Sequence, residues 1–153
     1  MNLFTIGFTQ KNAETFFGLL DANGIECLVD VRLNPNGQLS RFAFEKDLPF
    51  FLEHLVHGCK YSWRPDLAPT SDMLKEVRTK GTPMNEDYEE FARVFKAHVR
   101  SSSNIGDFAD AYGDFKNVCL LCSEATTEKC HRRLVGEVLL ERFPERIGKV
   151  TDL

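Results

Sequence analysis

The stretch "LFTIGFTQKNAETFFGLLDANGIECLVDVR", residues 3–32, contains the unit that decides the fold. Residues 3–6 are a short apolar run rich in β-formers, which Gly7 would end, and they predict a strand. Phenylalanines and leucines give residues 12–22 one apolar face, and an Asn-Gly pair stops the resulting helix. Residues 25–32 are almost continuously apolar, which is typical of a parallel strand covered on both faces. Strand, helix and strand in this order predict a βαβ unit.

The same alternation continues to the end of the chain. Helical spacing recurs, and short strands are expected between the helices; the helices fall at 44–57, 72–79, 85–100, 105–112 and 128–143, and the strands at 60–63, 117–122 and 146–150. The sequence therefore predicts an α/β fold, a Rossmann-like three-layer sandwich with a mostly parallel sheet of about five strands and right-handed crossovers. No repeat, low-complexity segment or linker divides residues 1–153, so a single domain is expected.

Composition narrows the classes of function. A net charge of -4 over 153 residues argues against broad binding to a nucleic-acid backbone, so a nucleic-acid partner would need a local basic patch. The chain has no long apolar run and no signal-peptide pattern at its start, so we expect a cytoplasmic protein without a membrane partner. Five cysteines is an odd number for a disulfide framework, which predicts reduced thiols. The oligomeric state is left open.

Polar residues follow three of the predicted strands. Ligands of open parallel sheets bind beyond the carboxyl ends of the strands, because the loops there face solvent. Thr9, Arg32 and Glu124 lie in or directly after those ends, and we expect them to bind a ligand. Asp30 lies inside an apolar strand and needs a partner, either in a structural ion pair or on the ligand itself. Arg32, together with Arg41 in the following loop, suits bidentate binding of phosphate or carboxylate.

The segment "CLLCSEATTEKCHRR", residues 119–133, allows two kinds of site. A zinc site would combine Cys119, Cys122, Cys130 and His131. Strand alternation places Cys119 and Cys122 on opposite faces, however, so the sequence predicts no metal site. The other reading is a reactive thiol, Cys122, where strand becomes loop. The next helix is then expected to start near residues 126–127, with Cys130 closing its first turn near the positive helix end.

The residues expected to carry chemistry are Cys122, Cys130 and His131. Cys130 also shares a helix face with apolar residues, so simple packing stays open for it. His131 is either a general acid or base or a hydrogen-bonding support. Arg132 is the expected ligand arginine, because Arg133 lies four residues before Glu137 and suits a surface ion pair. The spacing of Cys122 and Arg132 is too long for the compact Cys-x5-Arg phosphate loop.

Three motifs resemble a family of largely bacterial proteins, the domain of unknown function 488 (DUF488). They are "TIGFT", "LVDVR" and "LLCSEATTEKCHRRLV", and the matching residues are Gly7, Asp30, Arg32, Pro35, Phe44, Tyr61, Leu120, Leu121, Cys122, Glu124, Cys130, His131 and Arg132. The resemblance implies an α/β domain with a site built from these motifs. Three positions depart from the family pattern: Phe8 and Asp152 stand where the family has histidines, and Leu67-Ala68-Pro69 stands for Leu-Gly-Gly.

The leading hypothesis is a small cytosolic enzyme that binds a phosphate-bearing ligand, such as a nucleotide or a nucleic-acid end, over the strand ends. Arg32, Arg41 and Arg132 would hold the anion, His131 would move protons, and Cys122 or Cys130 would be the nucleophile or its support. One alternative is a non-enzymatic binding or regulatory module. Another is a thiol redox sensor that uses Cys122 and Cys130. Whether the chain is an enzyme stays open, and no cofactor is assigned.

Overall fold

The computed structural model describes residues 1–36, 41–79, 88–101 and 105–153. The strands are β1 (Asn2–Gly7), β2 (Cys27–Asp30), β3 (Lys60–Trp63), β4 (Asn117–Cys122) and β5 (Val150–Asp152). The α-helices are α1 (Ala13–Ala22), α2 (Leu48–Leu55), α3 (Ser71–Thr79), α4 (Tyr88–Ser101), α5 (Phe108–Ala111) and α6 (His131–Arg142), with 3-10 turns at Arg41–Ala43 and Pro65–Leu67. Residues 85–87 of the predicted 85–100 helix lie outside the described residues.

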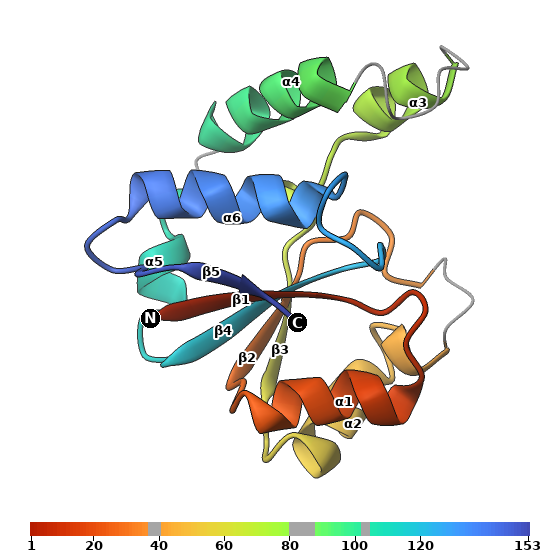
Figure 1. Cartoon of the computed structure of the whole chain (residues 1–153), viewed down its shortest axis with the longest axis vertical. Coiled ribbons are helices and arrows are strands. Elements are labelled where there is room, and N and C mark those ends of the chain that lie inside the picture. The colour runs from red at the N-terminus through yellow and green to blue at the C-terminus, as the bar shows by residue number, and fades with distance from the viewer. Residues whose placement is uncertain (37–40, 80–87, 102–104) are drawn as a thin grey trace.

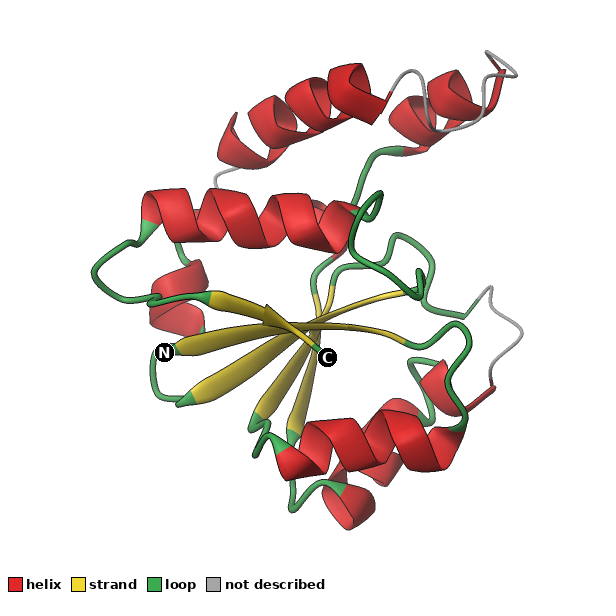
Figure 2. Ribbon diagram, viewed as in Figure 1, coloured by secondary structure: helices red, strands yellow, loops and turns green. Residues whose placement is uncertain are grey.

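The five strands form one sheet in the order β3-β2-β4-β1-β5, and every pairing in it is parallel. Helices α1 and α2 cover one face, whereas α5 and α6 cover the other, and α4 packs against the outer side of α6 (Figure 1). Each face buries its own apolar cluster against the sheet. These layers confirm the predicted α/β sandwich, whose alternation of helices and strands is also visible in Figure 2.

The strand order places a switch point at the centre of the sheet. β4 lies between β2 and β1, so the chain leaves β1 through α1 toward one edge and leaves β4 through α6 toward the other edge. Gly7 and Cys122, the last residues of β1 and β4, are register partners. Where neighbouring strands send their connections in opposite directions, a crevice opens beyond their carboxyl ends. The topology therefore puts the end of β4 where a ligand of this fold class binds.

The last strand differs from its predicted position. It was expected at residues 146–150, but β5 spans Val150–Asp152. The backbone N–H groups of Arg146 and Ile147 donate to the carbonyl of Phe143, closing a turn after α6, so this stretch cannot pair with β1. As a result, Asp152 is in the sheet, opposite Thr5.

Within the described residues, no helix combines the length and the apolar character needed to cross a membrane.

Candidate functional site

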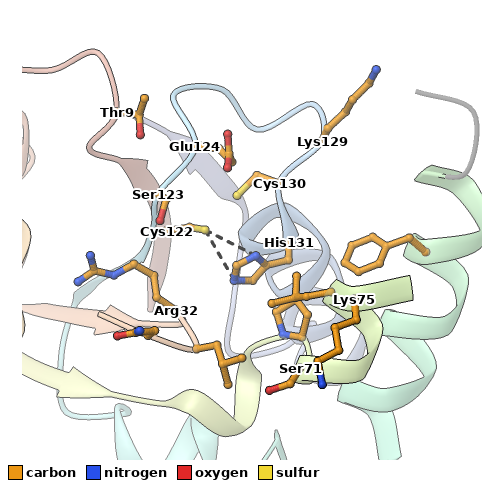
Figure 3. A pocket seen from close by; sticks show the side chains of 15 residues that line it. Thr9, Arg32, Ser71, Lys75, Cys122, Ser123, Glu124, Lys129, Cys130 and His131 are labelled. Carbon is orange, nitrogen blue, oxygen red and sulfur yellow. Dashed lines mark hydrogen bonds between the residues drawn. The ribbon is translucent and has the colours of Figure 1, made fainter. Parts of the chain in front are cut away.

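A cavity of about 770 Å³ lies at the carboxyl ends of the central strands, beside the first residues of α6 (Figure 3). Of the residues that the sequence nominated, those lining it are Thr9, Arg32, Cys122, Glu124, Cys130 and His131. They come from the segments after β1, β2 and β4 and from the start of α6. The loops are tied together, since the backbone N–H of Thr9 donates to the carbonyl of Ser123 at 3.0 Å. The expected convergence at one edge of the sheet is therefore present.

Cys122 ends β4 and has a side chain that is almost wholly buried. Its sulfur accepts hydrogen bonds from the thiol of Cys130 and from the backbone N–H groups of Ser123 and Glu124. These donors, Cys130 first, lower the pKa of the Cys122 thiol, although burial acts in the opposite direction. The hydrogen bond to Cys122, followed by burial, raises the pKa of Cys130. Of the two thiols, Cys122 is therefore the more acidic, and Cys130 donates a hydrogen bond to it.

Cys130 does not close the first turn of a helix, as the sequence had predicted. It is the N-cap of α6, with an extended backbone conformation, and the helix begins at His131. The expected start at residues 126–127 is wrong because tertiary contacts hold the preceding loop. The backbone N–H of Thr9 donates to the carbonyl of Ser123, and the guanidinium of Arg132 donates to the carbonyl of Glu124. These contacts override the local capping signal of the threonines. The thiol nevertheless lies at the positive end of the helix, where negative charge is favoured.

His131 is held in one orientation between the sheet and α4. Its Nε2 lies 2.8 Å from the carbonyl oxygen of Val31, and a carbonyl can only accept, so Nε2 carries a proton. The ring of Phe95 packs edge-on against the imidazole at 5.8 Å between centroids. The sulfur of Cys122 lies 3.6 Å from the second ring nitrogen, Nδ1, and 3.7 Å from Nε2, the two contacts drawn dashed in Figure 3. The imidazole is thus positioned to exchange a proton with that sulfur.

Asp30 and Arg32 form a buried ion pair beneath the cavity. The Arg32 guanidinium donates to Asp30 through Nε at 2.8 Å and through Nη2 at 2.5 Å, and Nη2 also reaches the carbonyl of Ala43 at 2.7 Å. The hydroxyl of Tyr61 donates to the same carboxylate at 2.7 Å. Asp30 is fully buried and is not among the described residues that line the cavity, whereas Arg32 lines it. The geometry therefore favours the structural reading of Asp30.

The guanidinium of Arg32 keeps one unused donor. The side chain is 3% exposed, and among the described residues its Nη1 has no hydrogen-bond partner. The ring of Phe8, at 5.3 Å from Cζ, contributes a cation–π contact but no acceptor. A buried charged donor without an acceptor is costly, so such a group calls for an explanation.

Arg132 supports the loop and does not face the cavity. It is fully buried, and its Nη1 donates to the carbonyl of Glu124 at 2.6 Å and to the sulfur of Cys130 at 3.3 Å. Its Nη2 pairs with Asp152 at 3.3 Å, and Asp152 in turn accepts from Thr5 at 2.6 Å. Arg132 does not belong to the described cavity lining, so its contacts favour positioning over ligand binding.

Gly7 allows this packing. A Cβ at this position would lie 1.6 Å from the carbonyl oxygen of Glu124 and 2.9 Å from Nη1 of Arg132. Only a residue without a side chain leaves room for the loop to approach β1 so closely.

Arg41 lies away from the other predicted site residues. It is exposed in the 3-10 turn before α2, with its guanidinium 5.3 Å from the ring of Phe44. It does not belong to the described cavity lining. The expectation that Arg41 helps to hold the ligand has no geometric support here.

Some residues that line the cavity were not predicted from the sequence. Ser71 and Lys75 of α3, Phe91 of α4 and Lys129 of the loop line it. Together with Arg32, the lysines make basic side chains more numerous than acidic ones, since Glu124 is the one acidic residue among the lining residues that the structure describes. No local signal marks α3 and α4 as cavity walls, because α4 is placed by packing against α6 and α3 by packing against α4. The excess of positive charge favours an anionic occupant.

One group of metal-binding side chains lies in this cavity. Ligand atoms of Cys122, Cys130 and His131 all lie within 4.8 Å of one another. Cys119 packs in the apolar cluster on the opposite face of the sheet, as alternation predicted. The objection to zinc that the sequence raised therefore applies to Cys119 and not to the other three residues.

The departures from the family pattern have clear places in the structure. Phe8 is buried against the Arg32 guanidinium, Asp152 pairs with Arg132, and Pro69 lines the cavity. Two of the residues that depart from the family pattern, Phe8 and Asp152, thus contact the two buried arginines directly.

The fold and the cavity define a class: a doubly wound α/β domain with a cysteine–histidine site at the switch point of its sheet. The family model described as "Domain of unknown function DUF488" matches residues 12–139, which contain the Asp30–Arg32 pair and the whole cysteine–histidine segment. The chain belongs to this family. Comparisons with curated proteins and with solved structures gave no match.

Proposed function

We propose that the chain is a small enzyme that binds a phosphate-bearing ligand, such as a nucleotide or a nucleic-acid end, in the cavity beside Cys122. The observation that carries the proposal is the unpaired donor of Arg32. Arg32 lines the cavity, and its buried guanidinium keeps Nη1 without an acceptor in the described part of the chain. A phosphate oxygen would satisfy that donor with a charge-assisted hydrogen bond. The basic side chains of Lys75 and Lys129 on the same cavity support an anion there.

Cys122 and His131 supply the parts of a nucleophilic mechanism. Nδ1 of His131 accepts the thiol proton, and the Cys122 sulfur attacks the phosphorus, so that a P–S bond forms as the bond to the leaving oxygen breaks. His131 passes the proton to that oxygen. Water then attacks the phosphorus while Nδ1 of His131 takes a proton from it, the P–S bond breaks, and that proton returns to the Cys122 sulfur as phosphate leaves. The donors around the sulfur, from Cys130, Ser123 and Glu124, support the thiolate at the start and the end of this cycle.

Calorimetric titration tests the binding step. Inorganic phosphate, nucleoside monophosphates and a 5′-phosphorylated oligonucleotide are compared with unphosphorylated counterparts. Arg32→Lys keeps a positive charge beside Asp30 but loses the guanidinium fork, and we expect affinity to fall by about tenfold or more. Arg41→Ala removes an arginine outside the cavity and serves as the matched control. Equal affinity in the wild type and Arg32→Lys would contradict the proposal.

The chemical step has its own test. Cys122→Ser should retain ligand binding and lose turnover of the ligand, measured as release of phosphate. If no phosphorylated compound is bound, and Cys122→Ser and His131→Ala lower only the melting temperature, the enzyme proposal fails. The predicted non-enzymatic module would then be the better account.

A thiol redox sensor is a second candidate, and one observation favours it. The sulfurs of Cys122 and Cys130 are neighbours, and the thiol of Cys130 donates to Cys122. Hydrogen peroxide would take two electrons and two protons from the pair, leaving a disulfide and two molecules of water. Mass spectrometry after mild peroxide treatment should then show a loss of two hydrogens that is absent in Cys130→Ser. Oxidation that stops at a single modified sulfur argues against this candidate.

A further inference from the structure

We infer that Cys122, Cys130 and His131 form a zinc-binding site. This inference goes beyond the proposed function and departs from the expectation that the chain has no metal site. Each residue offers one ligand atom, and these atoms lie within 4.8 Å of one another. Two thiolates and one imidazole with an open position form a known zinc donor set.

The hydrogen bond that His131 makes to the sheet is of the kind that metal-binding histidines make. Its Nε2–H donates to the carbonyl of Val31 at 2.8 Å, which fixes the tautomer and leaves the lone pair on Nδ1. Histidines that bind metals almost always donate their other ring N–H to a carbonyl, a carboxylate or water. Packing against Phe95 holds the ring in place. Nδ1, 3.6 Å from the sulfur of Cys122, is therefore the ring nitrogen left to bind an ion.

The distances fit a tetrahedral zinc ion. With Zn–S bonds of about 2.3 Å and Zn–N bonds of about 2.0 Å, a tetrahedron separates sulfur and nitrogen by about 3.5 Å. The Cys122 sulfur and Nδ1 of His131 are 3.6 Å apart. Because the same sulfur is 3.7 Å from Nε2, the imidazole has to turn so that the Nδ1 lone pair points at an ion held by the sulfur.

The charges around the cluster also balance with zinc present. Two thiolates neutralise one Zn²⁺ ion, and each buried arginine already has its own carboxylate, Arg32 with Asp30 and Arg132 with Asp152. Nη1 of Arg132 donates to the sulfur of Cys130, and backbone N–H groups donate to Cys122. Donors of this kind orient the first ligands of a metal and stabilise thiolates. The positive side chains on the cavity thus do not prevent binding of a cation.

The donor set selects the metal. Ca²⁺ and Mg²⁺ prefer oxygen ligands, whereas zinc binds thiolate and imidazole together. Because all three residues line the cavity, the fourth coordination position would open into it. While zinc is bound, Cys122 is not free to attack a substrate. Zinc would therefore inhibit the proposed thiol enzyme.

The test uses the full chain, reduced and stripped of metal. We expect one equivalent of Zn²⁺ to bind and to protect two cysteines, Cys122 and Cys130, from alkylation, read by mass spectrometry of peptides. Co²⁺ should give the visible bands of a tetrahedral site and a thiolate charge-transfer band. Cys130→Ser and His131→Ala should weaken binding by at least ~100-fold, since loss of an outer hydrogen-bond partner alone costs tenfold to 100-fold.

The matched control is Cys59→Ser, which changes a buried cysteine outside the cluster and should bind zinc as the wild type does. If a ligand variant does not fold, the alkylation pattern of the wild type still decides. Less than one equivalent of zinc, or protection of cysteines other than Cys122 and Cys130, overturns the inference. Phosphate binding by metal-free protein, compared between wild type and Arg32→Lys, is measured separately. Failure of the zinc site and failure of the proposed function are thereby distinguished.

Discussion

Two buried arginines, Arg32 and Arg132, lie on either side of the same thiol site and do different things. Arg32 follows β2, is paired by Asp30 and lines the cavity with one donor unused. Arg132 is at the second position of α6, and its Nη atoms bind the carbonyl of Glu124, the sulfur of Cys130 and the carboxylate of Asp152. From the sequence, both arginines were expected to bind the anion.

The two arginines differ in position, since Arg32 lines the cavity and Arg132 does not belong to its described lining. The Nη1 of Arg132 donates to the carbonyl of Glu124 and to the sulfur of Cys130, so this residue fixes the loop between β4 and α6. Arg32 is anchored on its Asp30 side and keeps its Nη1 free of acceptors among the described residues. Arg132 also keeps one nitrogen, Nε, without a partner among the described residues, so the lining of the cavity by Arg32 is what makes Arg32 the ligand candidate. Substitutions around the two residues can break or sharpen this contrast.

The largest effect is expected from Asp30→Ala. It leaves the Arg32 charge buried without its carboxylate, and breaking a buried pair in this way costs about 3–5 kcal/mol of the free energy of unfolding. Urea denaturation followed by circular dichroism measures the loss. The double variant Asp30→Ala/Arg32→Met removes both charges and should recover part of the stability. A double variant no more stable than Asp30→Ala would show that the uncompensated charge is not the cause.

Gly7→Ala should have the next largest effect, and it acts on the Arg132 side. The added methyl group would collide with the carbonyl of Glu124, so the loop and Arg132 must move. Overpacking of this kind costs about 1–3 kcal/mol. We expect a lower unfolding midpoint together with weaker zinc binding, because Cys122 and Cys130 flank the displaced loop. Gly18→Ala is the control, since a Cβ there meets no atom within 4 Å. If Gly7→Ala is destabilised but binds zinc with unchanged affinity, the position of this loop does not control the zinc site.

The sequence predicted the fold more fully than the site. Except for the last strand, the strands and the buried helices could be located from periodicity, because residues that face the core recur at regular spacing in the sequence. The gathering of Cys122, His131 and Arg32 followed from the rule for strand ends. The direction of Arg132 did not, because its partner Asp152 lies in β5, which starts after the predicted strand. The start of α6 was misplaced for a related reason, since distant contacts of the preceding loop outweigh the threonine capping signal.

Asp152→Asn should have a smaller effect. The Asp152 carboxylate is 38% exposed, so water screens its attraction to Arg132. The amide keeps an oxygen that accepts from Thr5 and Arg132, and we expect a loss of about 1 kcal/mol or less. Thermal unfolding at low and high salt measures it, and salt should reduce the difference between the variant and the wild type. A loss as large as that of Asp30→Ala would mean that the two arginines depend equally on their carboxylates.

The smallest effect is expected from Arg41→Ala, which tests the contrast from outside the cavity. Arg41 is exposed, and its described contact is a cation–π interaction with Phe44. Substitution of such a surface residue changes stability by no more than about 0.5 kcal/mol in either direction. Binding of phosphate, measured by calorimetry, should match the wild type, while Arg32→Lys loses affinity. If Arg41→Ala weakens phosphate binding as much as Arg32→Lys does, general positive charge attracts the ligand, and the buried guanidinium has no special role.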